Sequence, residues 1–200
     1  LLQTLPLVMA RSESLAARLE ALGCDREKIR INRTALPMDR FPFQLRPNPA
    51  DGAWRLLQAC RFIPKKGLDL TLNAFAGFHR KNPKATLVLA GEGPLLSALK
   101  KQTAALGLEG AVQFPGFYQQ EELIQAFREA HLFLHPSRTT AAGDQEGVPN
   151  SMLEAMATGL PVAATQHGGI PEAVTSGEDG LLVAEDDAPA LEEALSTLTT

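Results

Sequence analysis

The sequence has few of the features that mark secreted, zinc-bound or membrane-spanning proteins. Only Cys24 and Cys60 are cysteines, and they lie far apart and in no ligand-like spacing. A disulfide framework and a cysteine-based zinc site are therefore disfavoured, and a cytoplasmic setting is predicted. No apolar run approaches the ~20 residues that cross a bilayer, so no transmembrane segment is predicted. Peripheral association with the inner face of a membrane stays open.

A strong excess of charge is also lacking. The net charge is −4 at pH 7, and the Lys and Arg residues are scattered along the chain rather than clustered. Duplex nucleic acid normally requires a basic face, so no nucleic-acid partner is predicted. The four histidines show no metal-ligand spacing, and no metal site is predicted. A hydrophobic fraction of 44% and a charged fraction of 21% indicate an ordinary globular protein rather than a disordered one.

Short apolar runs alternate with longer amphipathic runs from about Trp54 onward, as is typical of repeated βα units. The predicted strands are 55–60, 86–90, 111–114, 131–135, 161–164 and 180–183. The predicted helices are 68–80, 95–106, 121–130, 151–158, a short one near 171–174, and 189–198. Several strands are apolar for most of their length, as strands buried on both faces of a parallel sheet must be. The pattern predicts an α/β fold with a Rossmann-like, doubly wound parallel sheet.

Residues 1–49 have a different pattern. Residues 13–22 have the composition of a helix, with a capping serine before them and a glycine after them. Residues 41–49 are rich in proline and are interpreted as a linker. The apolar opening lacks an initiator Met and a basic leader, so we expect it to come from the interior of a longer protein. We expect residues 1–49 to be the end of one domain with its linker, and residues 50–200 to be a second domain.

Two acidic residues, Glu146 and Glu154, lie where a loop after a predicted strand enters a predicted helix. Doubly wound folds bind ligands at this edge of the sheet. Pro149 favours a helix start near that residue, which places Glu146 in the loop and Glu154 about one turn into the helix. The helix start would offer free N–H groups and partial positive charge to a phosphate or to sugar hydroxyls. Taken alone, the pair is better explained by two solvated surface side chains.

Arg61 and Lys66 form a second candidate, just past the first predicted strand. The planar donor fork of Arg and the mobile charge of Lys suit a diphosphate, although an ordinary exposed basic loop explains them equally well. Gly91 and Gly93 follow the strand 86–90 and would let the backbone approach a ligand closely, or they simply form a βα turn. A dinucleotide fingerprint would need a third glycine and an acidic residue that are missing, so a nicotinamide site is disfavoured.

Two more glycines, Gly168 and Gly169, follow the strand 161–164 at the same edge of the predicted sheet. They are expected to be turn residues, with or without a part in a site. Among the four histidines only His167 lies beside the proposed site, and the others are expected to be packing or surface residues.

Together these motifs resemble a known family. In chain order they are Arg61 with Lys66-Gly67, Ala90-Gly91-Glu92-Gly93-Pro94, Phe114-Pro115-Gly116-Phe117, Glu146 with Glu154 and the following Ala155-Met156-Ala157-Thr158-Gly159-Leu160-Pro161-Val162, and Gly168-Gly169-Ile170-Pro171-Glu172. They resemble the retaining glycosyltransferases of GT-B fold called family 4, or glycosyltransferase group 1. The similarity covers about residues 50–198, in the part that binds the donor. One departure is Cys60, where a glycine commonly precedes the arginine.

The resemblance implies transfer of a hexose from a nucleoside-diphosphate sugar, with retention and without a metal ion or cofactor. Arg61 and Lys66 would neutralise the diphosphate, and Glu146 would hold hydroxyls of the transferred sugar. Glu154 would bind the ribose of the nucleotide. The further donor contacts that the resemblance implies are Gly91, Gly93, Gly116, Phe117, Gly147, Val148, Pro149 and Asn150. UDP is the expected nucleotide and GDP the second choice, on family frequency alone.

The acceptor is expected to be a glycan or a lipid-linked molecule that binds through a missing N-terminal domain. Residues 136–147 also look like family members that build bacterial exopolysaccharide. The chain alone is expected to bind nucleotide weakly and to transfer no sugar. Three other readings remain open: a glycosidase, which has no need of the Arg–Lys pair, a non-hydrolysing nucleotide-sugar epimerase, and a non-catalytic nucleotide-sugar-binding module.

Overall fold

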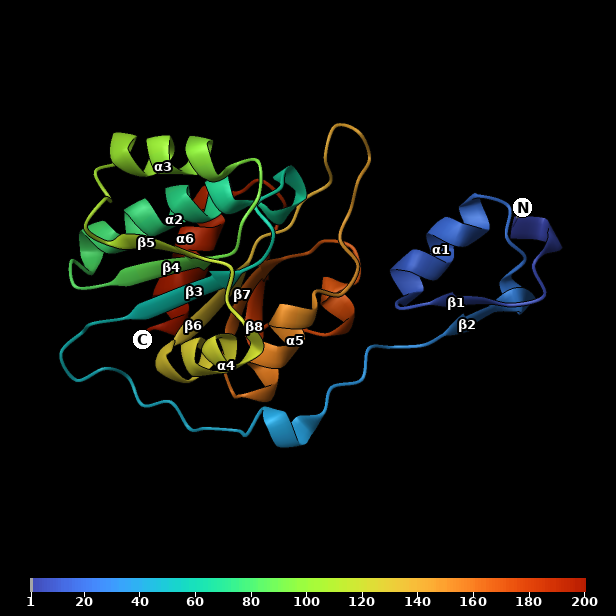
Figure 1. Ribbon diagram of the computed structural model, residues 1–200, viewed down its shortest axis with the longest axis horizontal. Helices are drawn as coiled ribbons and strands as arrows, with labels where there is room; N and C mark the ends of the chain where they lie inside the picture. The colour runs from blue at the N-terminus through green and yellow to red at the C-terminus, as the bar shows by residue number, and fades with distance from the viewer. Residues whose placement is uncertain (1) are drawn as a thin grey trace.

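The computed structural model describes residues 2–200, and its main part is a sheet of six parallel strands (Figure 1). The strands are β3 Arg55–Ala59, β4 Thr86–Ala90, β5 Val112–Gly116, β6 Leu132–His135, β7 Val162–Thr165 and β8 Gly180–Val183. Their order is β5-β4-β3-β6-β7-β8, so the chain runs outward from β3 to β5 and then returns to the other side of β3. The predicted Rossmann-like, doubly wound sheet is confirmed. Such sheets bind ligands where the strand order reverses, which here is between β3 and β6.

Helices cover both faces of this sheet (Figure 1). They are α2 Leu68–Lys81, α3 Leu96–Ala105, α4 Gln120–Glu129, α5 Asn150–Ala157 and α6 Ala188–Leu198. Residues of α2, α3 and α6 belong to the core on one face, and residues of α4 and α5 to the core on the other. The predicted short helix near 171–174 is the 3-10 helix η5, Ile170–Glu172. Within residues 2–200, no helix combines the length and apolar character needed to cross a membrane.

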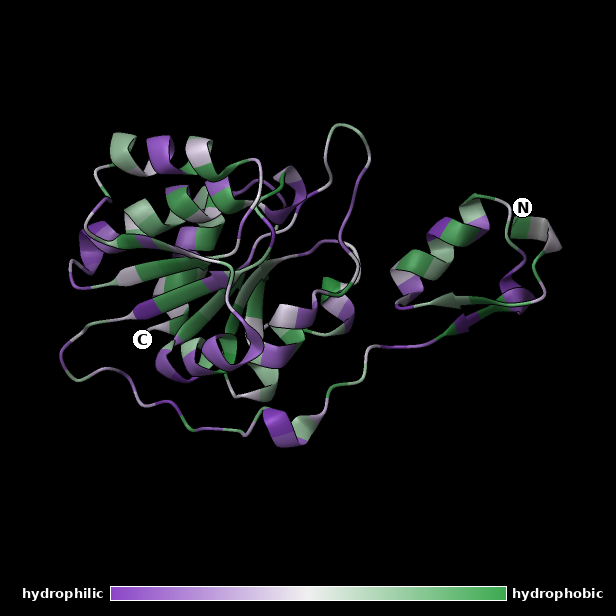
Figure 2. Cartoon of the chain, in the orientation of Figure 1, coloured by the Kyte–Doolittle hydropathy of each residue, from purple (hydrophilic) through white to green (hydrophobic). Residues whose placement is uncertain are grey.

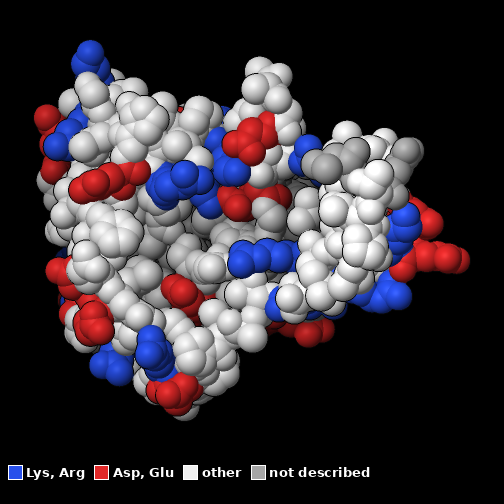
Figure 3. Space-filling model, turned by 45° about the vertical axis from the view of Figure 1, so that its right-hand side comes forward, with Lys and Arg blue, Asp and Glu red and all other residues white. Residues whose placement is uncertain are grey.

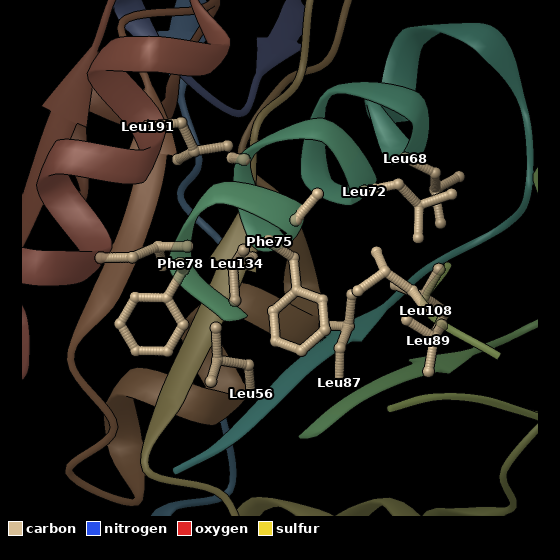
Figure 4. Close-up of a cluster of buried hydrophobic side chains, with 14 of the residues drawn as sticks. Leu56, Leu68, Leu72, Phe75, Phe78, Leu87, Leu89, Leu108, Leu134 and Leu191 are labelled. Carbon is tan, nitrogen blue, oxygen red and sulfur yellow. The ribbon is translucent and has the colours of Figure 1, made fainter. Parts of the chain in front are cut away.

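The two faces of the sheet have separate hydrophobic cores, because neighbouring residues of a strand point to opposite sides. Leu56 belongs to the core under α2, and Leu57 to the core under α4 and α5. Phe75 and Phe78 of α2 have no exposed surface and pack toward the strands (Figure 4). Burying a side chain of this size stabilises a fold by ~1.5–3 kcal/mol. The central strands are correspondingly hydrophobic, whereas the outer helices are mixed (Figure 2).

A small unit precedes the main sheet and is drawn in blue in Figure 1. Its elements are the 3-10 helix η1 Leu2–Thr4, β1 Val8–Ala10, α1 Glu13–Ala21, the 3-10 helix η2 Arg26–Lys28 and β2 Ile29–Ile31, followed by the 3-10 helix η3 Met38–Arg40. The predicted helix is confirmed: Ser12 Oγ accepts the N–H of Leu15 at 3.1 Å, and Gly23 follows with a φ of 86°. The strands β1 and β2, which pair in parallel, were not predicted, because three residues are too few to show a periodic pattern.

The predicted linker, residues 41–49, has no regular secondary structure. Arg46 fixes it to the side of the sheet at which the strands begin. The Arg46 guanidinium donates to the carbonyl oxygens of Arg128, Ala130 and Thr158 at 2.8 to 3.1 Å. These carbonyls lie at the ends of α4 and α5, where helices leave acceptors without internal partners. One side chain thus caps two helices. The division into residues 1–49 and 50–200 stays a prediction.

Candidate functional site

A cavity of about 740 Å³ opens at the carboxyl ends of the central strands. Of the predicted site residues, its lining includes Arg61, Lys66, Gly91, Gly93, Phe117, Glu146, Val148, Pro149 and Asn150. Gly116, Gly147 and Glu154 are neighbours of these residues but are not part of the lining. Figure 3 shows basic and acidic side chains around a hollowed part of the surface. The structure thus gathers most of the predicted residues, although their roles stay predictions.

The loop that carries Arg61 and Lys66 is held by a buried polar side chain. Gln58 in β3 has no exposed surface, and its Nε2 donates to the Lys66 carbonyl oxygen at 2.8 Å. Its Oε1 accepts from Thr71 Oγ1 at 2.6 Å. A buried amide that loses its partners costs ~1–3 kcal/mol, so both bonds favour one position of the loop. The short 3-10 helix η4, Pro64–Lys66, completes the turn into α2.

Lys66 and Glu146, predicted to bind different parts of a ligand, contact each other directly. Lys66 Nζ and a carboxylate oxygen of Glu146 form an ion pair at the cavity. The exposed fraction is 12% for the Lys66 side chain and 15% for that of Glu146, so solvent screens the pair only weakly. Each partly buried charge therefore depends on a partner of opposite sign. A phosphate bound to Lys66 would replace Glu146 as that partner and free its carboxylate to accept hydrogen bonds.

The backbone of Glu146 is held by His167, which follows β7. The Glu146 N–H donates to His167 Nε2 at 2.8 Å, and His167 Nδ1 lies 2.7 Å from Glu185 Oε1. Burial raises the pKa of Glu185, but hydrogen bonds from the Thr139 N–H and from His167 outweigh burial and lower it. A Cβ atom on Gly168, which has a φ of +54°, would overlap the Glu146 carbonyl oxygen. The two loops therefore pack backbone against backbone at this point.

Gly91 and Gly93 line the cavity after β4. A Cβ atom on Gly91 would overlap the carbonyl oxygen of Cys60, and one on Gly93 would lie 2.5 Å from that of Phe62. These glycines therefore bring the β4 turn against the end of β3, and they also leave backbone at the cavity wall. Cys60 lines the cavity as well. Burial raises the pKa of its thiol to about 12, so the thiol is uncharged at neutral pH and is a weak nucleophile.

Helix α5 begins at the cavity wall, where Asn150 and Ser151 belong to the lining. Ser151 Oγ donates to the carbonyl oxygen of Ala59 at 2.7 Å, which ties the helix start to the end of β3. A helix start carries partial positive charge and free N–H groups, so it favours an anionic or hydroxylated ligand. Glu154 lies one turn further along α5, on the same side of the helix as Asn150 and Ser151. Burial raises the pKa of Glu154.

Several cavity residues were not predicted: Arg11, Ala59, Cys60, Ala90, Glu92, Tyr118, Leu123 and Ser151. Most of them are neighbours of predicted residues at the same strand ends, and this adjacency could have indicated them. Arg11 had no such signal, because it belongs to the small unit before the linker. That unit docks through Glu172, whose carboxylate accepts the N–H groups of Glu13 and Ser14, both at 2.9 Å.

In the part of the chain that the structure describes, no group of three or more His, Cys, Asp or Glu side chains is arranged to hold a metal ion. The expectation that the site uses no metal stays a prediction. The charged side chains in the cavity lining are Arg11, Arg61, Lys66, Glu92 and Glu146.

Comparisons with known proteins match this chain to a family. Residues 41–200 match the family described as "Glycosyl transferases group 1". The amylovoran biosynthesis glycosyltransferase AmsK of Erwinia amylovora is 37% identical over 182 residues, covering 91% of this chain and 44% of that protein. A GDP-mannose-dependent alpha-(1-6)-phosphatidylinositol monomannoside mannosyltransferase of Mycobacterium tuberculosis is 33% identical over 186 residues, covering 92% of this chain and 47% of that protein.

The chain thus spans about half the length of these curated relatives. Among solved structures, Anabaena Alr3699/HepE in complex with UDP and glucose has the same fold, with a TM-score of 0.82 and 24% identity. The match covers 96% of this chain and 53% of that protein.

Proposed function

The chain belongs to the group 1 glycosyl transferases, and on that premise we propose that it is the donor-binding half of a retaining, metal-independent hexosyltransferase. The observation that carries the proposal is the convergence of Arg61, Lys66 and Glu146 on one cavity beside the start of α5. Two cations suit the diphosphate of a nucleotide sugar, and a carboxylate suits the hydroxyls of its sugar. The donor is therefore a nucleoside-diphosphate sugar.

The donor lies across the strand ends in this proposal. Arg61 and Lys66 hold the diphosphate, and Glu146 holds the transferred hexose. Glu154, one turn into α5, binds the ribose, which is in keeping with a donor that extends along this helix. The N–H groups of residues 147–150 contact the sugar, and the backbone at Gly116 and Phe117 contacts the base.

The chemistry follows from where charge develops. The bond between the anomeric carbon and the β-phosphate oxygen breaks, and the diphosphate keeps the electron pair. The sugar gains oxocarbenium character, the acceptor oxygen forms the new bond on the same face, and the proton of the acceptor hydroxyl passes to the departing phosphate oxygen. Cations already in place at the leaving group lower the barrier to this charge separation. Arg61 and Lys66 thus supply the charge that a metal ion supplies in other transferases.

Donor and acceptor are proposed only as classes. The name of the M. tuberculosis relative specifies GDP-mannose, whereas the HepE crystals contain UDP. A base read by backbone leaves little side-chain code, so we keep a UDP-sugar as the first expectation and a GDP-sugar as the second on family frequency alone. The acceptor is a glycan or lipid-linked molecule of bacterial polysaccharide synthesis, a role that the name of AmsK supports. It binds in the half of the relatives that this chain does not span.

Turnover in a protein that joins this chain to its acceptor-binding half tests the proposal. Arg61→Ala and Lys66→Ala are expected to lower kcat by about 10²–10³-fold, the usual effect of removing one preorganised charge-stabilising group. Lys101→Ala, which removes an exposed lysine of α3, is the control and leaves kcat unchanged. Near-normal rates in the first two variants would refute the assigned roles.

Product analysis separates the other readings. Free sugar released from a simple glycoside without nucleotide would indicate a glycosidase, and proton exchange into a converted sugar nucleotide would indicate an epimerase. The isolated chain is expected to bind nucleotide weakly and to transfer nothing, because one wall of the reaction cleft is absent. Efficient transfer by the isolated chain would contradict this proposal.

A further inference from the structure

His167 connects two segments next to the cavity without belonging to its lining. It is 1% exposed, and both of its ring nitrogens have partners. Nε2 lies 2.8 Å from the backbone nitrogen of Glu146, and Nδ1 lies 2.7 Å from Oε1 of Glu185. The second carboxylate oxygen of Glu185 accepts the Thr139 N–H at 2.7 Å. A continuous chain of hydrogen bonds thus runs from the segment after β6 to the loop that carries Glu146.

These partners fix the position of the imidazole proton. A backbone N–H can only donate, so Nε2 must present its lone pair to Glu146. The ring proton is then on Nδ1, where Glu185 accepts it. His167 is therefore neutral, and the Glu185 carboxylate selects the tautomer that can accept from Glu146.

We propose that His167 is a positioning residue for sugar transfer and that Glu185 sets its tautomer. The imidazole fixes the backbone of Glu146, and the fixed backbone directs the Glu146 side chain toward Lys66 and the cavity. The neighbouring Gly168 allows the loops to pack closely enough for this bond. The inference rests on the proposed function, because Glu146 is taken to hold the transferred sugar. It adds His167 as a residue that determines the position of the Glu146 carboxylate.

The test uses the protein that joins this chain to its acceptor-binding half. His167→Leu removes the acceptor at similar volume, whereas His167→Gln keeps an acceptor oxygen near the position of Nε2. His131→Leu is the matched control, because His131 Nδ1 also accepts a backbone N–H, that of Arg55, at 3.0 Å but at the opposite edge of the sheet. The measured quantities are kcat, donor KM and Tm.

At neutral pH, His167→Leu is expected to lower kcat by about 10–100-fold, because a small displacement of a substrate-holding group costs this much. Donor KM changes little, because Arg61 and Lys66 still hold the diphosphate. His167→Gln recovers most of kcat, because its side-chain oxygen still accepts the Glu146 N–H. Glu185→Gln gives an intermediate loss of kcat, because the tautomer is no longer fixed. His131→Leu lowers Tm and leaves kcat unchanged.

Unchanged kcat in His167→Leu would overturn the inference, as would a failure of His167→Gln to recover kcat. If His167→Leu does not fold, Glu185→Gln decides, and unchanged kcat in that variant would overturn the inference. A wild-type protein that neither binds a nucleoside diphosphate nor transfers sugar would instead contradict the proposed function.

Discussion

The same kind of hydrogen bond serves different purposes at the two ends of the parallel strands, called here the carboxyl edge and the amino edge of the sheet. At the carboxyl edge, His167 accepts a backbone N–H and holds the loop of Glu146. At the amino edge, His131 accepts the N–H of Arg55 and ties β6 to β3. The first bond ends at a charged side chain in a cavity, and the second joins two strands. The chemistry of a bond therefore does not reveal whether it supports activity or stability, whereas its place along the strands does.

Arginine and lysine show the same contrast. Arg46, at the amino ends of the strands, donates through its guanidinium to carbonyl oxygens at the ends of two helices. Lys66 at the carboxyl edge is instead held through its backbone by Gln58, and its ammonium group is left at the cavity beside Glu146. At the carboxyl edge, a hydrogen bond to the Lys66 backbone holds the loop and leaves the ammonium group at the cavity. At the amino edge, the charged guanidinium of Arg46 itself holds the linker.

Among variants that test the comparison between the two edges, Glu146→Gln at the carboxyl edge is expected to have the largest effect on kcat. The variant keeps the shape of the side chain but removes the charge that pairs with Lys66, and kcat is expected to fall about 10²–10³-fold. Nucleoside diphosphate is expected to bind more tightly, because it no longer competes with Glu146 for Lys66. Kinetics and calorimetry measure the two effects, with Glu109→Gln as a remote control. Weaker nucleotide binding together with normal kcat would reverse the assignment.

At the amino edge, Arg46→Ala is expected to lower stability rather than activity. The guanidinium satisfies carbonyl oxygens at the ends of α4 and α5, and losing these charged donors costs about 2–3 kcal/mol. This corresponds to a fall in Tm of roughly 5–10 °C for a chain of this size. Arg40→Ala, which removes one exposed hydrogen bond to Gln120, is the matched control with little change in Tm. A normal Tm in Arg46→Ala would show that the linker is not fixed in this way.

His135 ends β6 at the carboxyl edge but lies in the core, so its titration should affect stability. Complete burial lowers the pKa of His135 well below its usual range, and the charge of Lys66 lowers it further. Below about pH 6.5 the unfolded chain takes up the proton and the folded one does not. The free energy of unfolding therefore decreases as the pH is lowered, by about 1.4 kcal/mol per pH unit. Urea unfolding between pH 5 and 7.5 should show a smaller slope for His135→Leu. An identical slope would mean that the ring is protonated in the folded protein.

The smallest effect is expected at Phe117, which lines the cavity yet is 65% exposed. Because the base is proposed to contact backbone at this position, Phe117→Ala should change nucleotide affinity by less than about threefold, or ~0.6 kcal/mol. Calorimetric titration measures this directly. A loss of tenfold or more would show that the base stacks on the ring.

The sequence predicted the main sheet well because its strands are buried on both faces. Leu56 and Leu57 pack into separate cores on the two faces of the sheet, so successive residues of the strand are apolar. Such an apolar run can be recognised from neighbouring residues in the sequence. The strands β1 and β2 are too short to carry such a pattern. The Lys66–Glu146 contact joins residues that lie far apart in the sequence, and only the order of the strands brings them together.

Site residues were predictable where they sit at strand ends and form motifs. Arg11 was not, because it reaches the cavity only through the docking of the small unit by Glu172. The role of His167 was not predictable either, because its two hydrogen bonds join three loops that come together only in the folded chain. Local pattern therefore predicts the elements and their ends, but not the contacts between loops.

The most direct test of the account is a thermal-shift titration of this chain with UDP, GDP and ADP, in wild type and in the Arg61→Ala, Lys66→Ala double variant. We predict that one of the three nucleotides raises the wild-type Tm selectively, by an amount that follows from its affinity and concentration. The double variant should lose this shift, measured against its own Tm without ligand. Equal shifts in both proteins, or no shift with any nucleotide at high concentration, would contradict a diphosphate site at the strand ends.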